Sequence, residues 1–472
     1  MAAGIEPILP ETVAPATRPV ETVLKLTDTG NAERLALQHS SRLRYVPGIG
    51  WITWSGDRWE RDQDGAAARA AKQTIRSIYA EASAVEDADR RKQIAQWATR
   101  SESAAARRAM LELAQIEEAL IARADQLDAD PFLLACANGT VDLRTGQLRA
   151  AEPGDLLSLG TRLAYRPDAK APRWERFLEE VFAGDEDLIA FVRRWTGYCL
   201  TGDTTEQCFA ILYGTGANGK STLVDALKRT SGSHAQEAAF QTFALARSLG
   251  RDPRDDLAAL RGARMVTTSE PGRGRWLDTE VVKKITGGDE LVCRELFGKP
   301  FSYRPAFKLL VLTNHRPRIA ADDDAMWRRV HLIPFEQTFK RGEGQHLADH
   351  SLAARLSAEA EGILAWRVSG CLEWQRSGLG SAGAIDRATS EYRAAEDQVG
   401  RFLNERCELD PNATVIRADL RDAYATWCDQ EGERSLAASQ LGHDLARRGI
   451  ESAQIRVDDG VRKHAYRGLK LA

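Results

Sequence analysis

Residues 212–222 read LYGTGANGKST and bring together the groups that bind nucleotide phosphates. Gly214, Gly219, Lys220 and Ser221 fit the spacing G-x-x-x-x-G-K-[ST], in which glycines let backbone N–H groups face phosphate oxygens. The lysine reaches the β- and γ-phosphates, the hydroxyl binds Mg²⁺, and the helical stretch that follows points its N-terminus at the anion. The pattern predicts a site for ATP and Mg²⁺ formed by Gly214, Gly216, Asn218, Gly219, Lys220, Ser221 and Thr222.

Polar residues at the ends of later apolar runs could complete an ATPase. RMVTTSE ends in Glu270, which could hold Mg²⁺ or orient the attacking water, and KLLVLTN ends in Asn314, whose amide could position that water. In DDDAMWRRVHLIPF, Arg328 or Arg329 could stabilise transition-state charge in the site of a neighbouring subunit. The structural alternatives are a surface glutamate, an asparagine that caps a turn, and arginines paired with Asp322–Asp324.

The composition restricts the class of protein. The 472 residues exceed one ordinary domain, and the net charge of −3 means that any nucleic-acid affinity needs local basic surfaces. The seven cysteines contain no CxxC pair, which argues against a zinc site or a disulfide framework and favours a reducing compartment. The start lacks a secretory pattern and no apolar window is long enough for a membrane span, so we expect no membrane partner.

The N-terminal part of the chain shows two kinds of segment. Residues 1–20 are rich in Pro, Ala and Thr and predict a disordered tail. Residues 21–165 predict a mixed α/β domain, because aromatic and polar residues alternate at 44–62 as in a β-meander. Helical patterns follow at 65–127, and turn residues between short strands at 137–150 indicate a hairpin.

The central segment, 166–344, carries an α/β pattern. Residues 174–200 are helical, and apolar strand-like runs then recur, with helical stretches between the first two. This order predicts a mostly parallel sheet formed by residues 208–214, 264–270, 308–314 and 329–335.

The C-terminal segments are predicted to be a helical subdomain, 345–395, and a winged-helix-like domain, 396–472. The latter ends in a helix, a glycine break and two strands around DDG. Its basic residues could bind duplex DNA, although such modules also dock proteins. The basic positions are Arg447, Arg448, Arg456, Arg462, Lys463, Arg467 and Lys470.

The order of these motifs resembles the superfamily 3 helicases of phage and plasmid primase-helicases, which are related to the poxvirus primase-helicase. The stretches that carry the resemblance are WERFLEEVFAGDEDLIAFVRRWTGYCLTGDTTEQ, LYGTGANGKST, RMVTTSE, VVKKITGGDELVCRELFGKPFSYRPAFKLLVLTN and DDDAMWRRVHLIPF. ADPFLLACANGTVDLRTGQLR is similar to the family's lead-in domain, so the resemblance covers roughly residues 25–472. It implies an AAA+ phosphate-loop core that assembles into a ring, usually a hexamer, with ATP between subunits and a finger arginine serving the neighbouring site.

The resemblance also implies a β-hairpin that tracks single-stranded or forked DNA in the ring channel. By position the hairpin is LVCRELFGKPFSYRP, with Phe297 and Lys299 near its tip. Lys283 matches a family lysine that contacts DNA or nucleotide, and Lys284 lies beside it. One departure is Ser269, because generic AAA+ proteins place an aspartate before the residue equivalent to Glu270. With about 20 residues before the lead-in domain, we expect no primase domain, and hence a separate primase partner.

Three functions remain open. The leading hypothesis is an ATP-driven ring helicase of phage or plasmid replication, in the cytoplasm of a bacterial host. The alternative is an origin-binding initiator whose ATPase remodels DNA or loads another replication protein. A regulatory nucleotide-binding module is the third, and the full set of Lys220, Glu270, Asn314 and Arg328 or Arg329 argues against it. The hairpin residue Lys299 favours the helicase over the initiator.

Overall fold

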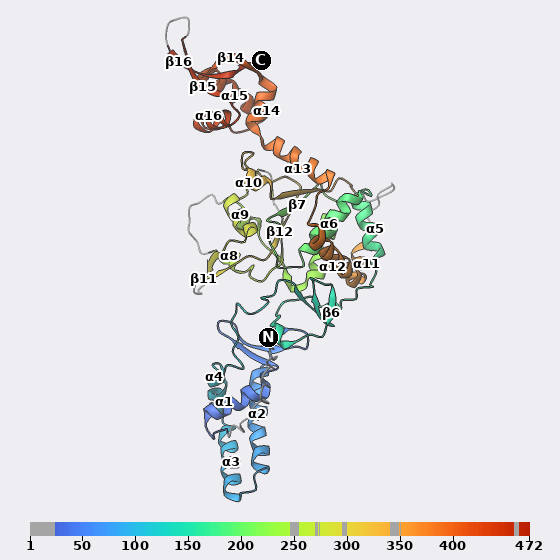
Figure 1. The fold of residues 1–472 in the computed structure, drawn as a ribbon, viewed down its shortest axis with the longest axis vertical. Coiled ribbons are helices and arrows are strands. Elements are labelled where there is room, and N and C mark those ends of the chain that lie inside the picture. Colours follow the sequence, from blue (N-terminus) through green and yellow to red (C-terminus); the bar gives the residue numbers. More distant parts are fainter. Residues whose placement is uncertain are drawn as a thin grey trace, which may run out of the picture. The chain divides into compact units, whose positions relative to one another are not determined.

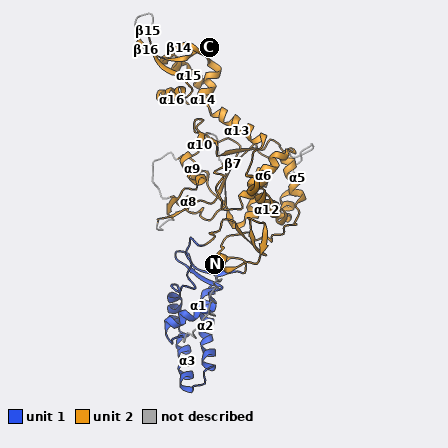
Figure 2. Ribbon diagram, in the orientation of Figure 1, with its two compact units in different colours: residues 1–55, 59–126 blue, residues 56–58, 127–472 orange. Residues whose placement is uncertain are grey.

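The computed structural model describes residues 24–245, 254–269, 272, 274–294, 300–339, 349, 351–456 and 462–472. Its contacts form two compact units, which are residues 1–55 with 59–126, and residues 56–58 with 127–472 (Figure 2). Within the described residues, no helix has the length and apolar character needed to cross a membrane.

The first unit combines helices with a small antiparallel sheet. The sheet has the order β1-β2-β3, which confirms the β-meander predicted at 44–62. Ala32 and Leu35 of α1 pack with Ile75 of α2 and Met110 of α4, so the alanine-rich helices share one core. The elements are α1 (Asp28–His39), β1 (Leu43–Val46), β2 (Gly50–Trp54), β3 (Trp59–Arg61), α2 (Ala66–Ser83), α3 (Ala88–Ser101) and α4 (Ala104–Ala114).

A five-stranded parallel sheet forms the centre of the second unit (Figure 1). Its spatial order is β13-β7-β12-β9-β8. Of these five strands, β7 comes first in the chain, and it lies between the two that come last, β12 and β13. All neighbouring pairs are parallel, which confirms the prediction from the four apolar runs. The strands are β7 (Phe209–Tyr213), β8 (Ala235–Glu237), β9 (Met265–Ser269), β12 (Lys308–Thr313) and β13 (Val330–Pro334).

Helices cover both faces of this sheet, because successive strand residues point to opposite sides. Ala210 and Leu212 face α5, α6, α7 and α12, whereas Phe209 and Ile211 face α8, α9, α10 and α13. The helical stretch expected at 174–200 forms two helices, α5 and α6. The α-helices around the sheet are α5 (Pro172–Val181), α6 (Glu186–Tyr198), α7 (Lys220–Ser231), α8 (Asp255–Ala258), α9 (Thr279–Gly287), α10 (Asp324–Trp327), α11 (Leu352–Ala358), α12 (Ala360–Ser377) and α13 (Gly383–Glu396). Short 3-10 helices are η1 (Pro153–Asp155), η2 (Gly232–His234) and η3 (Phe240–Phe243).

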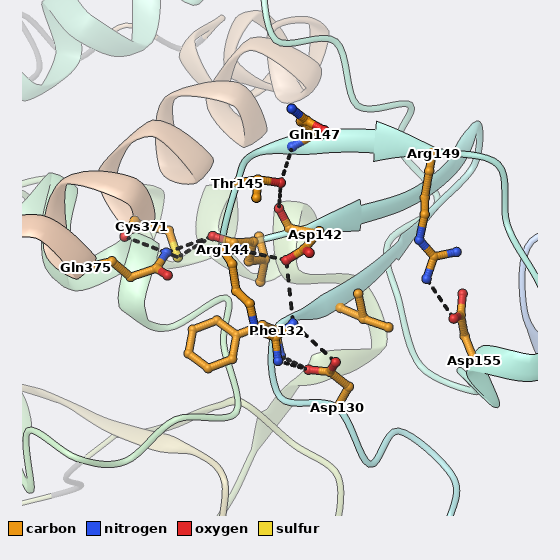
Figure 3. Close-up of polar contacts among 12 residues, drawn as sticks. Asp130, Phe132, Asp142, Arg144, Thr145, Gln147, Arg149, Asp155, Cys371 and Gln375 are labelled. Atoms are coloured by element: carbon orange, nitrogen blue, oxygen red, sulfur yellow. Dashed lines mark hydrogen bonds and ion pairs between the residues drawn. The ribbon is translucent and has the colours of Figure 1, made fainter. Parts of the chain in front are cut away.

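The hairpin expected at 137–150 is present and packs against α12. It is formed by β5 (Gly139–Asp142) and β6 (Gln147–Arg149), and β4 (Leu133–Cys136) adds a third antiparallel strand beside β5. Gln375 of α12 donates to the Leu143 carbonyl at 2.7 Å, and the Arg144 guanidinium pairs with Asp130 at 2.8 Å beside the Phe132 ring (Figure 3). The first compact unit therefore ends at residue 126, whereas the sequence pattern places a domain boundary at 165.

Two further antiparallel sheets belong to the second unit. β10 (Leu291–Arg294) pairs with β11 (Pro300–Tyr303), which confirms a hairpin over the stretch predicted from the resemblance. The C-terminal module, residues 398–472, contains a sheet of order β14-β16-β15 and confirms the expected helix followed by two strands. Its elements are α14 (Gln398–Arg406), β14 (Cys407–Ile416), α15 (Arg417–Glu431), α16 (Ala438–Arg447), β15 (Glu451–Arg456) and β16 (Arg462–Leu471).

Helices α6 and α12 approach each other at two glycines. A Cβ on Gly370 would lie 2.2 Å from the Arg193 carbonyl oxygen, and one on Gly197 would lie 2.1 Å from the Cys371 nitrogen. Beside this crossing the fully buried Arg367 donates to the Thr196 carbonyl and to the Thr230 and Ser231 hydroxyls. Burial lowers the pKa of Arg367 to about 10. The described acceptors of its guanidinium are carbonyl and hydroxyl oxygens at the ends of α6 and α7, and none of them is a carboxylate.

Gly370→Ala should lower the thermal midpoint, because the added methyl meets main-chain atoms that cannot move without separating the two helices. Overpacking of this kind costs about 1–3 kcal/mol. Gly383→Ala is the matched control, since a Cβ at that position in α13 meets nothing within 4 Å. Circular dichroism melting of both variants tests this, and equal midpoints would contradict the close approach of α6 and α12.

Candidate nucleotide-binding site

The loop between β7 and α7 has a backbone path that depends on its glycines. A Cβ on Gly214 would lie 2.3 Å from the Asn218 side chain and 2.3 Å from the Phe335 carbonyl oxygen. Gly219 has φ 88°, and its Cβ would lie 2.7 Å from Val181. Within the described residues, no hydrogen-bond acceptor meets the backbone N–H groups of 215–219. These donors and the N-terminus of α7 form an electropositive backbone surface suited to an anion.

Lys220 connects this loop to the neighbouring strand. Its ammonium donates to the Gly214 carbonyl at 2.6 Å, to Asn218 Oδ1 at 3.1 Å and to Asn314 Oδ1 at 3.0 Å. The side chain is buried, and this burial lowers the Lys220 pKa. The structure thus brings together Lys220 and Asn314, which are 94 positions apart in the chain.

The remaining predicted residues of the loop occupy the adjoining turn. Ser221 and Thr222 lie in the first turn of α7, and the Ser221 side chain is exposed. Glu270 directly follows β9 but lies outside the described residues, as do Phe297 and Lys299 of the hairpin tip. β9 is the neighbour of β12, so its carboxyl end lies at the same edge of the sheet as the loop.

The segment after β13 also holds the loop, which the sequence motifs did not indicate. The Phe339 backbone N–H donates to the Ala217 carbonyl at 2.7 Å, and the Asn218 side chain donates to the Phe335 carbonyl at 3.3 Å. Only the proximity of β13 to β7 in the sheet brings these groups together, and no local spacing encodes it.

The two adjacent arginines have different environments. Arg329 is 8% exposed, and its guanidinium donates to the Ala325 carbonyl at 2.6 Å and to Thr286 Oγ1 at 3.2 Å. Burial, with a smaller contribution from Arg328, lowers the pKa of Arg329. Arg328 is exposed, and its guanidinium has no hydrogen-bond or ion-pair partner among the residues that the structure describes. Arg328 is therefore the arginine available to a second molecule.

Both predicted lysines of α9 have acidic partners. Lys283 pairs with Asp323 Oδ2 at 2.6 Å, whereas Lys284 pairs with Glu280 at 2.6 Å on the exposed side of the same helix. The second oxygen of Asp323 accepts from the Met326 backbone N–H at 3.0 Å and so caps α10. Lys283 and Thr286, one helical turn apart, thus join α9 to Asp323 and Arg329, which lie on either side of α10, and Gly288 caps α9 with φ 76°.

The carboxylates of residues 322–324 form no ion pair with Arg328 or Arg329 among the residues that the structure describes. Asp322 pairs with Arg447 at 2.6 Å, Asp323 with Lys283, and Asp324 with Arg393 of α13. The three carboxylates therefore join the start of α10 to three other helices, α16, α9 and α13.

Two family models match separate parts of the chain. Residues 32–183 match the family described as "D5 N terminal like", and residues 212–329 match a family of unknown function, DUF5906. The second match begins at the phosphate loop motif and ends at Arg329.

Relatives of known origin are viral. The chain is 29% identical over 296 residues to an Acanthamoeba polyphaga mimivirus protein named "Putative helicase", covering 59% of this chain and 31% of the relative. It is 21% identical over 331 residues to an African swine fever virus protein named "Putative primase", covering 64% of this chain and 34% of the relative. The chain thus spans about a third of the length of these curated relatives.

A solved structure, the apo A form of the NrS-1 C-terminal region, is 14% identical to the chain, with a TM-score of 0.43. The match covers 64% of this chain and 78% of that one.

The Lys283–Asp323 pair should be energetically coupled. The double variant Lys283→Met with Asp323→Asn should lose about 0.5–1 kcal/mol less unfolding free energy than the two single variants lose together. The reason is that both side chains of the pair are partly shielded from water. The exposed pair Lys284→Met and Glu280→Gln is the control and should show near-additive changes. Calorimetric melting of the full chain measures both cycles, and strict additivity at Lys283 and Asp323 would show that the pair does not hold α10.

Proposed function

Because the chain is a relative of the primase-helicase family, we propose that it is an ATP-dependent DNA helicase of the superfamily 3, AAA+ type. The observation that carries the proposal is the meeting of the phosphate loop with Asn314 at Lys220. In open α/β sheets, ligands bind outside the carboxyl ends of strands where the connections diverge. β7 lies at such a point. The chain leaving β7 runs to β8 on one side of the sheet, whereas the chain leaving its neighbour β12 runs to β13 on the other side.

The residues of the site fit Mg²⁺ and the phosphates of ATP. The free backbone N–H groups of 215–219 and the N-terminus of α7 would hold the β- and γ-phosphates, and Lys220 would exchange its present oxygen acceptors for phosphate oxygens. Ser221 and Glu270 would hold Mg²⁺, which neutralises charge on the phosphates when bound. Glu270 or Asn314 would orient the attacking water toward the γ-phosphate.

Arg328 would complete the site of a neighbouring subunit in a ring, which we propose to be a hexamer. Its exposure supports this role, whereas Arg329 is committed to α9 and α10 within its own subunit. An arginine supplied in trans stabilises transition-state charge and ties hydrolysis to assembly.

The β10–β11 hairpin would contact DNA through its tip, with Lys299 on a phosphate and Phe297 on a base or sugar. Helix α9 leads directly into β10 and is bonded to α10, which ends beside Arg328. A hairpin displacement that moves α9 would therefore shift Arg328 as well. In this arrangement Lys283 would position α10 through Asp323, and its contact with DNA or nucleotide stays a prediction from the resemblance.

Lys220→Ala should abolish ATP hydrolysis and the unwinding of forked DNA, because the ammonium neutralises charge on the transferred phosphate. Lys228→Ala, on the same helix but paired with Glu237 at 2.6 Å, is the matched control and should keep both activities. Phosphate release and strand displacement measure the outcome. Hydrolysis at the wild-type rate by Lys220→Ala would rule out the proposed nucleotide site. If the native chain hydrolyses ATP but displaces no DNA strand, the origin-binding initiator becomes the favoured function.

Arg328→Ala should leave nucleotide binding intact and reduce hydrolysis by roughly 10³-fold or more, as expected for a finger arginine. Arg329→Ala should instead lower the thermal midpoint, because it leaves Thr286 and the Ala325 carbonyl without their buried donor. Mixing Arg328→Ala with Lys220→Ala subunits should restore some hydrolysis, since mixed rings contain complete interfaces. An active Arg328→Ala protein, or no rescue on mixing, would exclude the trans role.

A further inference from the structure

Two sets of basic residues in the C-terminal module differ in their surroundings, a difference that the sequence does not show. Several already have carboxylate partners. Arg447 pairs with Asp322 at 2.6 Å, Arg448 with Asp397 at 2.6 Å, and Lys470 with Glu408 at 2.7 Å. These cations are neutralised within the chain and contribute little to attraction of an external polyanion.

The second group lines a hollow of about 490 Å³ on the same module. Its charged side chains are Arg417, Arg421, Arg462 and Lys463, with His464 beside them, and no carboxylate is among the described residues that line it. Arg421 has only a loose ion pair, because its guanidinium lies 3.9 Å from the exposed Asp422 carboxylate. Arg417 and Arg421 were not among the basic residues indicated by the sequence, because they precede the basic tail by 26 or more positions.

Helix geometry adds to the positive potential of the hollow. Arg417 is the first residue of α15 and Ala438 is the first residue of α16, and both line the hollow. The N-termini of these two helices carry partial positive charge and unpaired N–H groups, which favour phosphate oxygens. Arg462 and Lys463 approach from the start of β16, so the cations come from separate elements around one opening.

We propose that this hollow binds the phosphate backbone of double-stranded DNA. Proteins that hold single strands stack bases on exposed aromatic rings, in addition to contacting phosphates. Tyr466 is the one Tyr, Phe or Trp among the described lining residues, and it is 6% exposed. The Arg417 guanidinium covers its ring at 5.0 Å and donates to the Ser452 hydroxyl. The hollow therefore offers cations and helix ends to a backbone, and the described lining residues include no exposed Tyr, Phe or Trp ring on which a base could stack.

The inference deepens the proposed function by giving duplex DNA its own binding site, away from the nucleotide loop. Such a site would hold the unopened duplex by its phosphates alone, without selecting a sequence. Affinity should then fall with salt, because each neutralised phosphate releases counterions.

The test compares two triple variants of the full chain with the same loss of charge. Arg421→Gln, Arg462→Gln and Lys463→Gln remove exposed cations of the hollow, whereas Arg447→Gln, Arg467→Gln and Lys470→Gln remove cations outside it. Fluorescence anisotropy with labelled duplex DNA, without nucleotide and at several salt concentrations, gives the affinity. The hollow variant should bind more weakly at low salt, and its plot of log K against log salt should be shallower by about 0.9 for each lost phosphate contact.

The control variant should keep its duplex affinity, and both should keep the thermal midpoint and the DNA-independent ATP hydrolysis of the native chain. Equal losses in the two variants, unchanged affinity of the hollow variant, or a larger loss for single-stranded than for duplex DNA would overturn the proposal. The helicase proposal fails separately, if the native chain binds duplex through the hollow yet neither hydrolyses ATP nor displaces a strand.

Discussion

The parallel pairing of β7 with β12 is the constraint on which the candidate site depends. In its register Thr313 lies opposite Tyr213, so both strands end at the same level. The chain leaving β7 forms the candidate phosphate loop and the chain leaving β12 supplies Asn314, and the buried ammonium of Lys220 bonds to both. A one-residue shift in this register would exchange the faces of the strand and remove Asn314 from Lys220. Burial of the sheet on both sides makes such a shift costly.

Much of this arrangement could be predicted from local sequence patterns. The four apolar runs are the strands β7, β9, β12 and β13 of the parallel sheet, and the turn residues between 137 and 150 marked a hairpin. The phosphate loop also lies where its motif requires, between a strand and a helix. These features depend on residues close together in the chain, so spacing and residue type were sufficient to identify them.

The features that could not be predicted depend on contacts between distant segments. Nothing in the WRR motif distinguishes Arg328 from Arg329, because Thr286 and Gln207, which accept from the buried Arg329 guanidinium, are supplied by distant segments. The ion pair of Lys283 could not be predicted either, because its partner Asp323 lies 40 positions away in the chain. In the same way, the division of C-terminal arginines into paired and unpaired groups depends on Asp322 and Asp397, outside the basic tail.

The two bonds from α9 to α10 also determine where the surrounding backbone can deform. A helix of nine residues spans about 14 Å and resists bending, and two contacts one turn apart prevent it from rolling on its neighbour. The link from this helix to the β10–β11 hairpin begins at Gly287 and Gly288, where added Cβ atoms would meet nothing closer than 3.7 Å. In the proposed mechanism, the backbone at this glycine pair would therefore set how much of a displacement at the hairpin reaches Arg328.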